Sequence, residues 1–164
     1  MALTPLLAAI AHQERILVFD RFDEDTAWAL GTLLRTRALA AAAPVVIDIR
    51  LFHRPLFFAA LPGSIPDNAD LIRRKCNVVQ RYHRSSYAMG LEMAAKGSSL
   101  TERYGLPMLD YAAHGGAFPL TVAGAGVIGC AAVSGLPQQA DHMLVVDALC
   151  TILDRDPAGF ALPG

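Results

Sequence analysis

Residues 117–134, AFPLTVAGAGVIGCAAVS, consist of two apolar runs on either side of a two-residue Gly-Ala turn. Apolar runs of this length around a glycine-containing turn are typical of a β-hairpin. If Ala123 faces Gly126 across the turn, the pairing places Gly115 opposite Ser134. The hairpin therefore predicts that the residues just before its first strand meet those just after its second.

The same hairpin contains the run GAGVIG at 124–129, which matches the glycine fingerprint of dinucleotide-binding folds. That fingerprint requires a helix to open within the glycines, so that the helix N–H groups meet the pyrophosphate. Here the strand-like residues 130–133 follow, and too little chain remains for another strand–helix–strand unit. We therefore interpret the glycines as a hairpin turn and reject a nucleotide site.

The rest of the chain divides into short apolar runs and amphipathic stretches. Strands are expected at 16–19, 45–51, 55–61, 117–123 and 126–134, and helices at 5–12, from Asp23 to before Pro44, from Asp67 to about Arg84, at 85–96 and at 138–154. One strand followed by two hairpins implies antiparallel pairing, with helices available for both faces of the sheet. The predicted fold class is α/β (α+β): an α/β/α sandwich with a five-stranded, mainly antiparallel sheet, formed by residues 1–164 as a single domain.

Composition narrows the possible partners. The formal net charge is −1, so no global field favours nucleic acid or an anionic membrane, and neither is expected as a partner. Residues 111–140 carry no Asp, Glu, Lys or Arg, but their six glycines and two prolines favour a buried hairpin over a membrane span. Because 54% of the residues are hydrophobic, we expect a homo-oligomer that buries the apolar surplus between subunits.

The cysteines and the N-terminal residues indicate a cytoplasmic protein. Cys76, Cys130 and Cys150 lie far apart, match no metal-binding spacing and sit in apolar runs, so three reduced, buried thiols are expected. Residues 1–10 lack the basic segment of a signal peptide. The five histidines likewise show no ligand spacing on one helix or strand, and no metal site is predicted.

Lys75 is the unusual residue of the helix expected from Asp67 to Arg84. At 100° per residue it projects into an apolar stripe, near Leu71 and Val79. A lysine there must extend its amine to solvent, meet a carboxylate, or meet a ligand or a partner chain. The arginines of this helix form a separate polar face, which is either solvated or a patch that binds anions.

Polar residues also converge at one end of the predicted second hairpin. There the strand ends at Ser134 and the last helix follows. The N–H groups at the start of that helix would favour an anionic group such as a carboxylate. Glycines at this corner would let the backbone or a ligand approach closely. Together with Lys75, the candidate ligand-binding residues are His114, Gly115, Gly116, Ser134, Asp141 and His142. The alternative is structural: Ser134 ties the turn and Asp141 supports the start of the helix.

Several ordered runs carry a resemblance that extends from about Phe22 to Leu153. They are Ile47-Asp48-Ile49-Arg50, Arg74-Lys75, Ser85-Ser86, His114-Gly115-Gly116-Ala117-Phe118-Pro119, Gly126-Val127-Ile128-Gly129, Val133-Ser134-Gly135-Leu136-Pro137 and Asp141-His142. This set resembles the haem-degrading-domain family (GlcG-like), in particular its uncharacterised intracellular branch. One departure is Leu71, where that branch leads us to expect tryptophan.

The resemblance implies a profilin-like sandwich assembled into a homo-oligomer. Some relatives bind haem and a few are reported to degrade it, which makes haem a candidate cofactor. No shared haem motif carries over to this sequence. By residue type alone, His12 or His114 could ligate the iron.

Three hypotheses about function follow, in order of preference. The first is a protein that binds a small molecule, either haem or another anionic ligand, at the corner near Lys75. The second is a structural or adaptor homo-oligomer, suggested by the apolar residues 143–146 and 148–150 of the last helix. The third is an enzyme, with catalytic residues undetermined, in which His114 or His142 acts as general acid or base beside Ser134 or Asp141.

Overall fold

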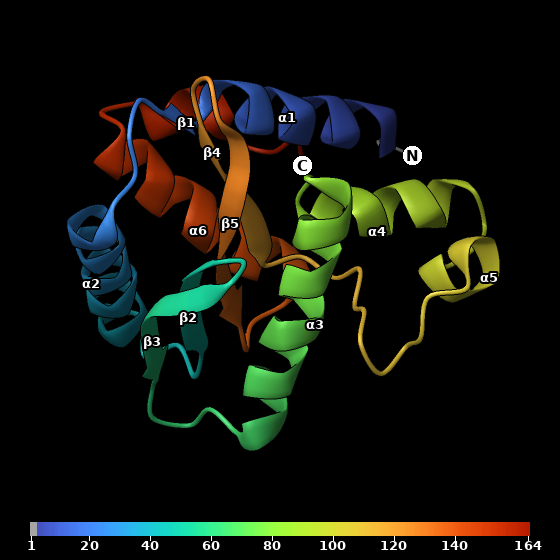
Figure 1. The fold of residues 1–164 in the computed structure, drawn as a ribbon, viewed down its shortest axis with the longest axis horizontal. Helices are drawn as coiled ribbons and strands as arrows, with labels where there is room; N and C mark the ends of the chain where they lie inside the picture. The colour runs from blue at the N-terminus through green and yellow to red at the C-terminus, as the bar shows by residue number, and fades with distance from the viewer. Residues whose placement is uncertain (1–2) are drawn as a thin grey trace.

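A five-stranded mixed sheet forms the centre of the computed structural model, which describes residues 3–164 (Figure 1). Its strands are β1 (Val18–Phe19), β2 (Val46–Leu51), β3 (Arg54–Ala60), β4 (Ala117–Val122) and β5 (Gly126–Ser134), in the spatial order β1-β4-β5-β2-β3. Only the short β1–β4 pair is parallel. The predicted five-stranded, mainly antiparallel sheet is therefore confirmed, with β5 at its centre.

Six α-helices and one 3-10 helix complete the described chain. They are α1 (Leu3–Ile16), α2 (Glu24–Ala40), α3 (Pro66–Tyr82), α4 (Ser86–Ala95), α5 (Leu100–Tyr104), α6 (Gln138–Ile152) and η1 (Pro157–Phe160). The sequence predicted α1 too short and β1 too long, because the first helix continues to Ile16. It missed α5 and η1 entirely.

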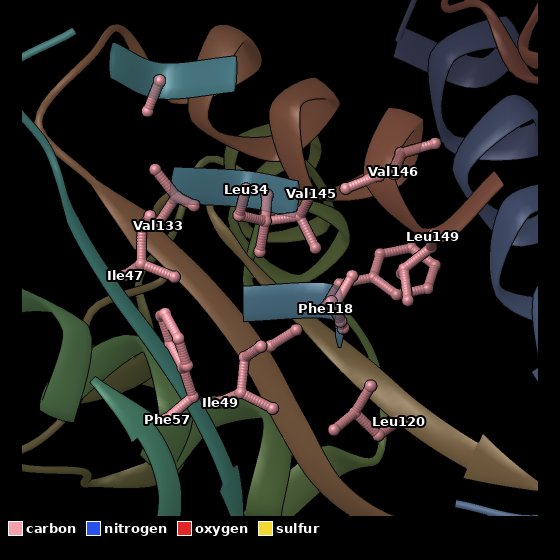
Figure 2. Packing of buried hydrophobic residues seen from close by; sticks show 14 of the residues in the cluster. Leu34, Ile47, Ile49, Phe57, Phe118, Leu120, Val133, Val145, Val146 and Leu149 are labelled. Atoms are coloured by element: carbon pink, nitrogen blue, oxygen red, sulfur yellow. The ribbon is translucent and has the colours of Figure 1, made fainter. Parts of the chain in front are cut away.

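The two faces of the sheet are covered by different helices, as the predicted α/β/α sandwich requires. Helices α2 and α6 pack on one face, where Phe118, Leu120, Ile47 and Ile49 meet Leu34 and other buried residues of the helices (Figure 2). Helix α3 packs on the opposite face through Ile72, Cys76 and Val79, which contact Val46, Ala117, Cys130 and Ala132. The alternation follows from the period of two along each strand.

The apolar residues of α6 are used within the chain itself. Val145, Val146, Ala148, Leu149 and Cys150 all belong to the core between α6 and the sheet, and each is at most 1% exposed. Met143 and Leu144 are half-buried against the same core, so most of this face is already covered within the chain. The adaptor hypothesis loses the feature that suggested it.

The β4–β5 hairpin has the predicted register at Ala117, but its turn and the pairing next to the turn differ from those expected. Its turn has three residues, and Val122 rather than Ala123 pairs with Gly126. Ile128 then forms a one-residue bulge in β5, so that Ala117 pairs with Ala132 as the predicted register requires. The amide of Val133 continues the ladder by donating to the Gly116 carbonyl over 2.9 Å.

The course of the chain after the turn shows how the glycine run is used. Residues 126–134 continue as β5 with no helix opening at the glycines, so the hairpin interpretation is confirmed.

Within residues 3–164, no helix has both the length and the apolar character that crossing a bilayer demands.

Candidate functional site

A cleft of about 470 Å³ lies where β5 ends and α6 begins. Four predicted candidates line it: Lys75 from α3, His114 from the loop before β4, Ser134 from β5 and Asp141 from α6. The remaining lining residues are Asn68, Leu71, Gly135, Leu136 and Gln138. The hairpin register and the helix phase of Lys75 thus bring residues from four segments to one place.

Lys75 and Asp141 form a buried ion pair in the wall of this cleft. The Lys75 Nζ lies 3.3 Å from Oδ2 of Asp141 and donates to the Val133 carbonyl over 3.3 Å, with both side chains 2% exposed. Burial lowers the pKa of Lys75 and raises the pKa of Asp141, and the mutual attraction opposes both shifts. Three outcomes were expected for the Lys75 amine, and the one observed is an ion pair with a carboxylate of the same chain.

Asp141 also fixes the turn that leads from β5 into α6. Its Oδ1 accepts the Leu136 amide over 3.0 Å, and its Oδ2 accepts the Gly135 amide over 3.2 Å. No side chain of the described residues caps the first turn of α6, whose initial N–H groups have no acceptor one turn back within the helix. Asp141 therefore has the structural role weighed above, and the start of the helix stays open to an acceptor.

Ser134 does not tie the turn. It is 0% exposed, and its hydroxyl has no hydrogen-bond partner among residues 3–164. Nearly all buried polar groups in proteins are hydrogen-bonded, because leaving one unpaired costs about 1–3 kcal/mol. A buried, unpaired hydroxyl in the wall of the cleft that Lys75 also lines is an arrangement that a bound ligand or an ordered water would complete.

The two glycines before β4 allow the close packing of this corner. A Cβ on Gly115 would lie 2.2 Å from the carbonyl oxygen of Gln138, and one on Gly116 would lie 2.3 Å from the Val133 oxygen. Gly116 also has a φ of 133°, which side chains disfavour. The Gly115 amide donates to Oε1 of Gln138 over 3.2 Å. Gly115 and Gly116 thus hold the first turn of α6 against the hairpin.

His114 is exposed and lines a second cleft as well as the first. Partial burial of the ring lowers the pKa of His114, and the positive charges of Lys75 and Arg74 lower it further. The imidazole is therefore neutral near pH 7 and could accept a hydrogen bond or ligate a metal. Within the described chain it forms no hydrogen bond with Ser134 or Asp141, so no acid–base pair is assembled there.

The second cleft, of about 310 Å³, is mainly apolar. Its walls come from α3, α4, α5 and the loop that follows α5, and include Met93, Leu100, Met108 and Tyr111. Sequence reasoning missed this cleft because it missed α5. The available signals were Ser99, which accepts the Glu102 amide as an N-cap, and Gly105, which ends the helix in the left-handed conformation.

The prediction that His142 shares the corner is wrong. Its Nε2 lies 2.8 Å from Oε1 of Gln13, whose Nε2 donates to the Phe160 carbonyl over 2.7 Å, and its ring packs on Tyr87 and Phe118. Successive helix residues differ by 100° in direction, so Asp141 and His142 cannot both face the cleft. His142 is fully buried and is removed from the candidate residues.

Other charged groups identified in the sequence serve the structure. Asp48 and Arg50, two positions apart on β2, form a salt bridge. On the polar face of α3, Arg73 pairs with Asp70 and Asp110, while Arg74 donates to the Met108 carbonyl over 2.7 Å. These arginines hold the loop after α5 rather than form an open patch for anions. His12 lines neither cleft and stacks on Phe160.

The structure defines an α/β/α sandwich with a cleft at the end of its central strand. Residues 22–150 match the family described as "Haem degrading protein HbpS-like", and the chain belongs to that family. The resemblance noted in the sequence is thereby confirmed.

Similar proteins extend this assignment over the whole chain. A UPF0303 protein of Acidobacterium capsulatum is 56% identical over 163 residues, covering 99% of each chain. One of Burkholderia thailandensis is 59% identical over 147 residues, covering 90% of this chain and 89% of its own.

Among solved structures, the Ybr137w protein is 30% identical with a TM-score of 0.83, covering 90% of this chain and 87% of its own. The protein chain of a PduOC–haem complex is 18% identical with a TM-score of 0.68, and the match covers 79% of this chain and 93% of that one. The second likeness concerns the fold alone.

The buried ion pair gives a direct test of the corner. We expect Lys75→Met to lower the unfolding free energy by about 3 kcal/mol, because it leaves Asp141 buried without its partner. The double variant Lys75→Met/Asp141→Asn removes the charge but keeps an acceptor for the turn, so it should recover at least half of that loss. Urea unfolding near pH 7 measures both values. A double variant no more stable than the single one would contradict the pairing.

The buried position of His142 predicts a pH dependence. Burial lowers the pKa of His142 to about 3, whereas a histidine in an unfolded chain titrates near about 6.5. Between these values the unfolded chain binds a proton that the folded chain does not. The resulting stability is fully present above about pH 6.5 and is lost as the pH falls toward 3, by about 1.4 kcal/mol per pH unit.

Urea unfolding between about pH 4 and pH 7 should show this slope, and His142→Gln should flatten it. The matched control is His53→Gln at an exposed position, which should keep the wild-type slope. An unchanged slope in His142→Gln would refute the assignment.

Proposed function

We propose that this chain binds a small anionic ligand in the cleft lined by Lys75, Ser134 and His114, with haem as the candidate cofactor. The observation that carries the proposal is the Ser134 hydroxyl, which is buried and unpaired among residues 3–164 in the wall of the cleft that Lys75 also lines. A ligand oxygen that accepts from this hydroxyl would remove the cost of leaving it unpaired.

Donors rather than net charge favour an anion here. An ammonium group has three donors, and Lys75 uses two of them on Asp141 and Val133, which leaves one for a ligand. Asp141 balances the lysine charge, so attraction depends on that donor, on Ser134 and on the uncapped start of α6. A carboxylate or a phosphate has the acceptors that these groups require.

The two neighbouring clefts suit a ligand that is apolar at one end and anionic at the other, as haem is. His114 lines both clefts and would supply an imidazole nitrogen to the iron. Met93, Leu100 and Tyr111 would contact the apolar ring, and Lys75 and Ser134 would bind a carboxylate. When bound, haem would supply the redox chemistry of its iron, and the chain would hold and orient it.

A haem titration tests the proposal. The wild-type chain should give a Soret shift that saturates at one haem per chain, and His114→Ala should alter or abolish the shift. Ser134→Ala should weaken binding about tenfold, because one charge-assisted hydrogen bond is lost. The fold of Ser134→Ala should be unaffected, since no group in residues 3–164 is hydrogen-bonded to that hydroxyl.

The matched control is Ser64→Ala, whose hydroxyl lies outside both clefts and bonds the Leu61 carbonyl. Absence of a saturable Soret shift would remove haem from the proposal. Ser134→Ala binding haem as tightly as the wild-type chain would place the ligand elsewhere.

A homo-oligomer is the second part of the proposal, and a different surface now supports it. Trp28 on α2 is 65% exposed and Phe58 on the edge strand β3 is 55% exposed, and both line a shallow depression between these elements. Exposed aromatic residues beside an unpaired strand edge are typical of subunit contacts. The three free, buried cysteines are consistent with a cytoplasmic setting, which is also proposed.

Sedimentation tests this second part. The wild-type chain should be oligomeric at micromolar concentration, and Trp28→Glu should shift it toward the monomer without unfolding it, because Trp28 is largely exposed. The Thr36→Glu substitution adds the same charge at an exposed position of the same helix, outside the depression, and serves as the control. A monomeric wild-type chain would contradict the proposal.

A further inference from the structure

Two cysteines meet where α3 packs on the sheet. Cys76 of α3 and Cys130 of β5 are 54 positions apart in sequence, and their Sγ atoms are 2.7 Å apart. A disulfide bond is about 2.05 Å long, so the sulfurs need to approach by less than one ångström to be joined. The pair lies in the cluster formed with Ile72, Val79 and Ala132, where Cys76 is 3% exposed and Cys130 is 0% exposed.

We propose that Cys76 and Cys130 are a site of reversible oxidation, at which a small hydroperoxide converts the two thiols into an intramolecular disulfide. The site is separate from the ligand cleft, and the inference does not rest on ligand binding. Neither thiol has a role in the fold beyond packing, which a disulfide would preserve.

The third cysteine lies too far from this pair to join the proposed disulfide. Cys150 belongs to α6 and is buried in the core on the opposite face of the sheet. The sheet therefore separates Cys150 from the other two thiols. Within residues 3–164 no three potential metal ligands are grouped together, so two sulfurs in contact are not accounted for by a metal centre.

Charged groups next to the pair influence its reactivity. Arg50 is the β2 residue paired with Cys130 in the ladder, and its side chain is 30% exposed. Its positive charge favours a thiolate, whereas Asp48 opposes one, and burial raises the pKa of the Cys130 thiol. Because both sulfurs are buried and the pKa of Cys130 is raised, oxidation should be slow compared with that of an exposed, low-pKa thiol.

The chemistry balances with one hydroperoxide as the oxidant. The Cys76 thiol, the slightly more exposed of the two, loses its proton and its sulfur attacks the peroxide oxygen, which breaks the O–O bond and forms a sulfenic acid. The released oxygen takes up that proton and leaves as an alcohol, or as water when the oxidant is hydrogen peroxide. The Cys130 sulfur then attacks the Cys76 sulfur, forms the S–S bond and expels the hydroxyl, which leaves as water with the Cys130 proton. The two sulfurs together lose two electrons, which the peroxide gains.

The bond would join the two elements that carry the ligand cleft. Lys75 immediately precedes Cys76 on α3, and Ser134 lies four residues after Cys130 on β5. A disulfide would therefore fix the helical turn that bears Lys75 to the strand that bears Ser134. It would also close a long loop of chain, which restricts the unfolded state and stabilises the fold.

Thiol counting on the full chain tests this proposal. The protein is treated with hydrogen peroxide, denatured and titrated for free thiols, before and after dithiothreitol. We expect three thiols to fall to one and to return to three, while the oxidised chain remains monomeric on a denaturing gel. The melting temperature should rise by about 5–10 °C on oxidation.

Peptide mapping identifies the pair. Trypsin leaves Cys130 and Cys150 on one peptide, so a protease that cuts before Asp141 is needed to separate them. Cys150→Ala should still lose two thiols on oxidation, whereas Cys76→Ala and Cys130→Ala should not form an intramolecular disulfide. Three free thiols after peroxide treatment, a bond that includes Cys150, or a chain-to-chain disulfide would overturn the proposal. Mapping of the wild-type chain decides the question even if a variant fails to fold.

Discussion

The buried pair of Lys75 and Asp141 is the contact on which the arrangement of the cleft depends. It joins α3 to the first turn of α6 across the end of β5, three elements that are distant in sequence. Two buried charges are stable only when each has a partner and its remaining hydrogen bonds are satisfied. Val133, Gly135 and Leu136 provide these bonds with backbone groups, so the position of the turn and that of the lysine determine each other.

This construction leaves hydrogen-bonding capacity unused next to the pair. One donor of Lys75, the Ser134 hydroxyl and the start of α6 all lie at the same cleft. A protein under selection for stability alone would pair or remove such groups, since each one costs free energy in the absence of a partner. Sites that bind ligands commonly retain unpaired groups of this kind, because the ligand completes them.

Sequence periodicity was sufficient to predict the sheet, the two hairpins and the inward direction of Lys75. It also placed His114, Ser134 and Asp141 together, although the hairpin turn was counted one residue too short. The bulge at Ile128 offsets the extra turn residue and so restores the predicted register. No pattern in the sequence predicts this bulge. The lengths of α1 and β1 were missed because Ile16 was assigned to the strand and the first helix was ended at His12, although Gln13, Glu14 and Arg15 are strong helix formers.

His142 and α5 mark where sequence reasoning stopped. Adjacency in sequence suggested that His142 accompanies Asp141, but the helix turns the histidine toward α1. Helix α5 has only five residues, too few for an apolar period to be recognised, and the second cleft was lost with it. The apolar residues of α6 were correctly recognised, but the sequence could not tell whether the sheet or another subunit covers them.

The position of Gln13 between His142 and Phe160 determines which tautomer the buried imidazole adopts. The Phe160 carbonyl can only accept a hydrogen bond, so Gln13 must present its amide nitrogen to η1 and its oxygen to the ring. His142 therefore carries its proton on Nε2 and leaves Nδ1 bare, as a buried acceptor without a donor among residues 3–164. A short turn near the C-terminus thus sets, through one glutamine, the protonation pattern of a side chain in the interior.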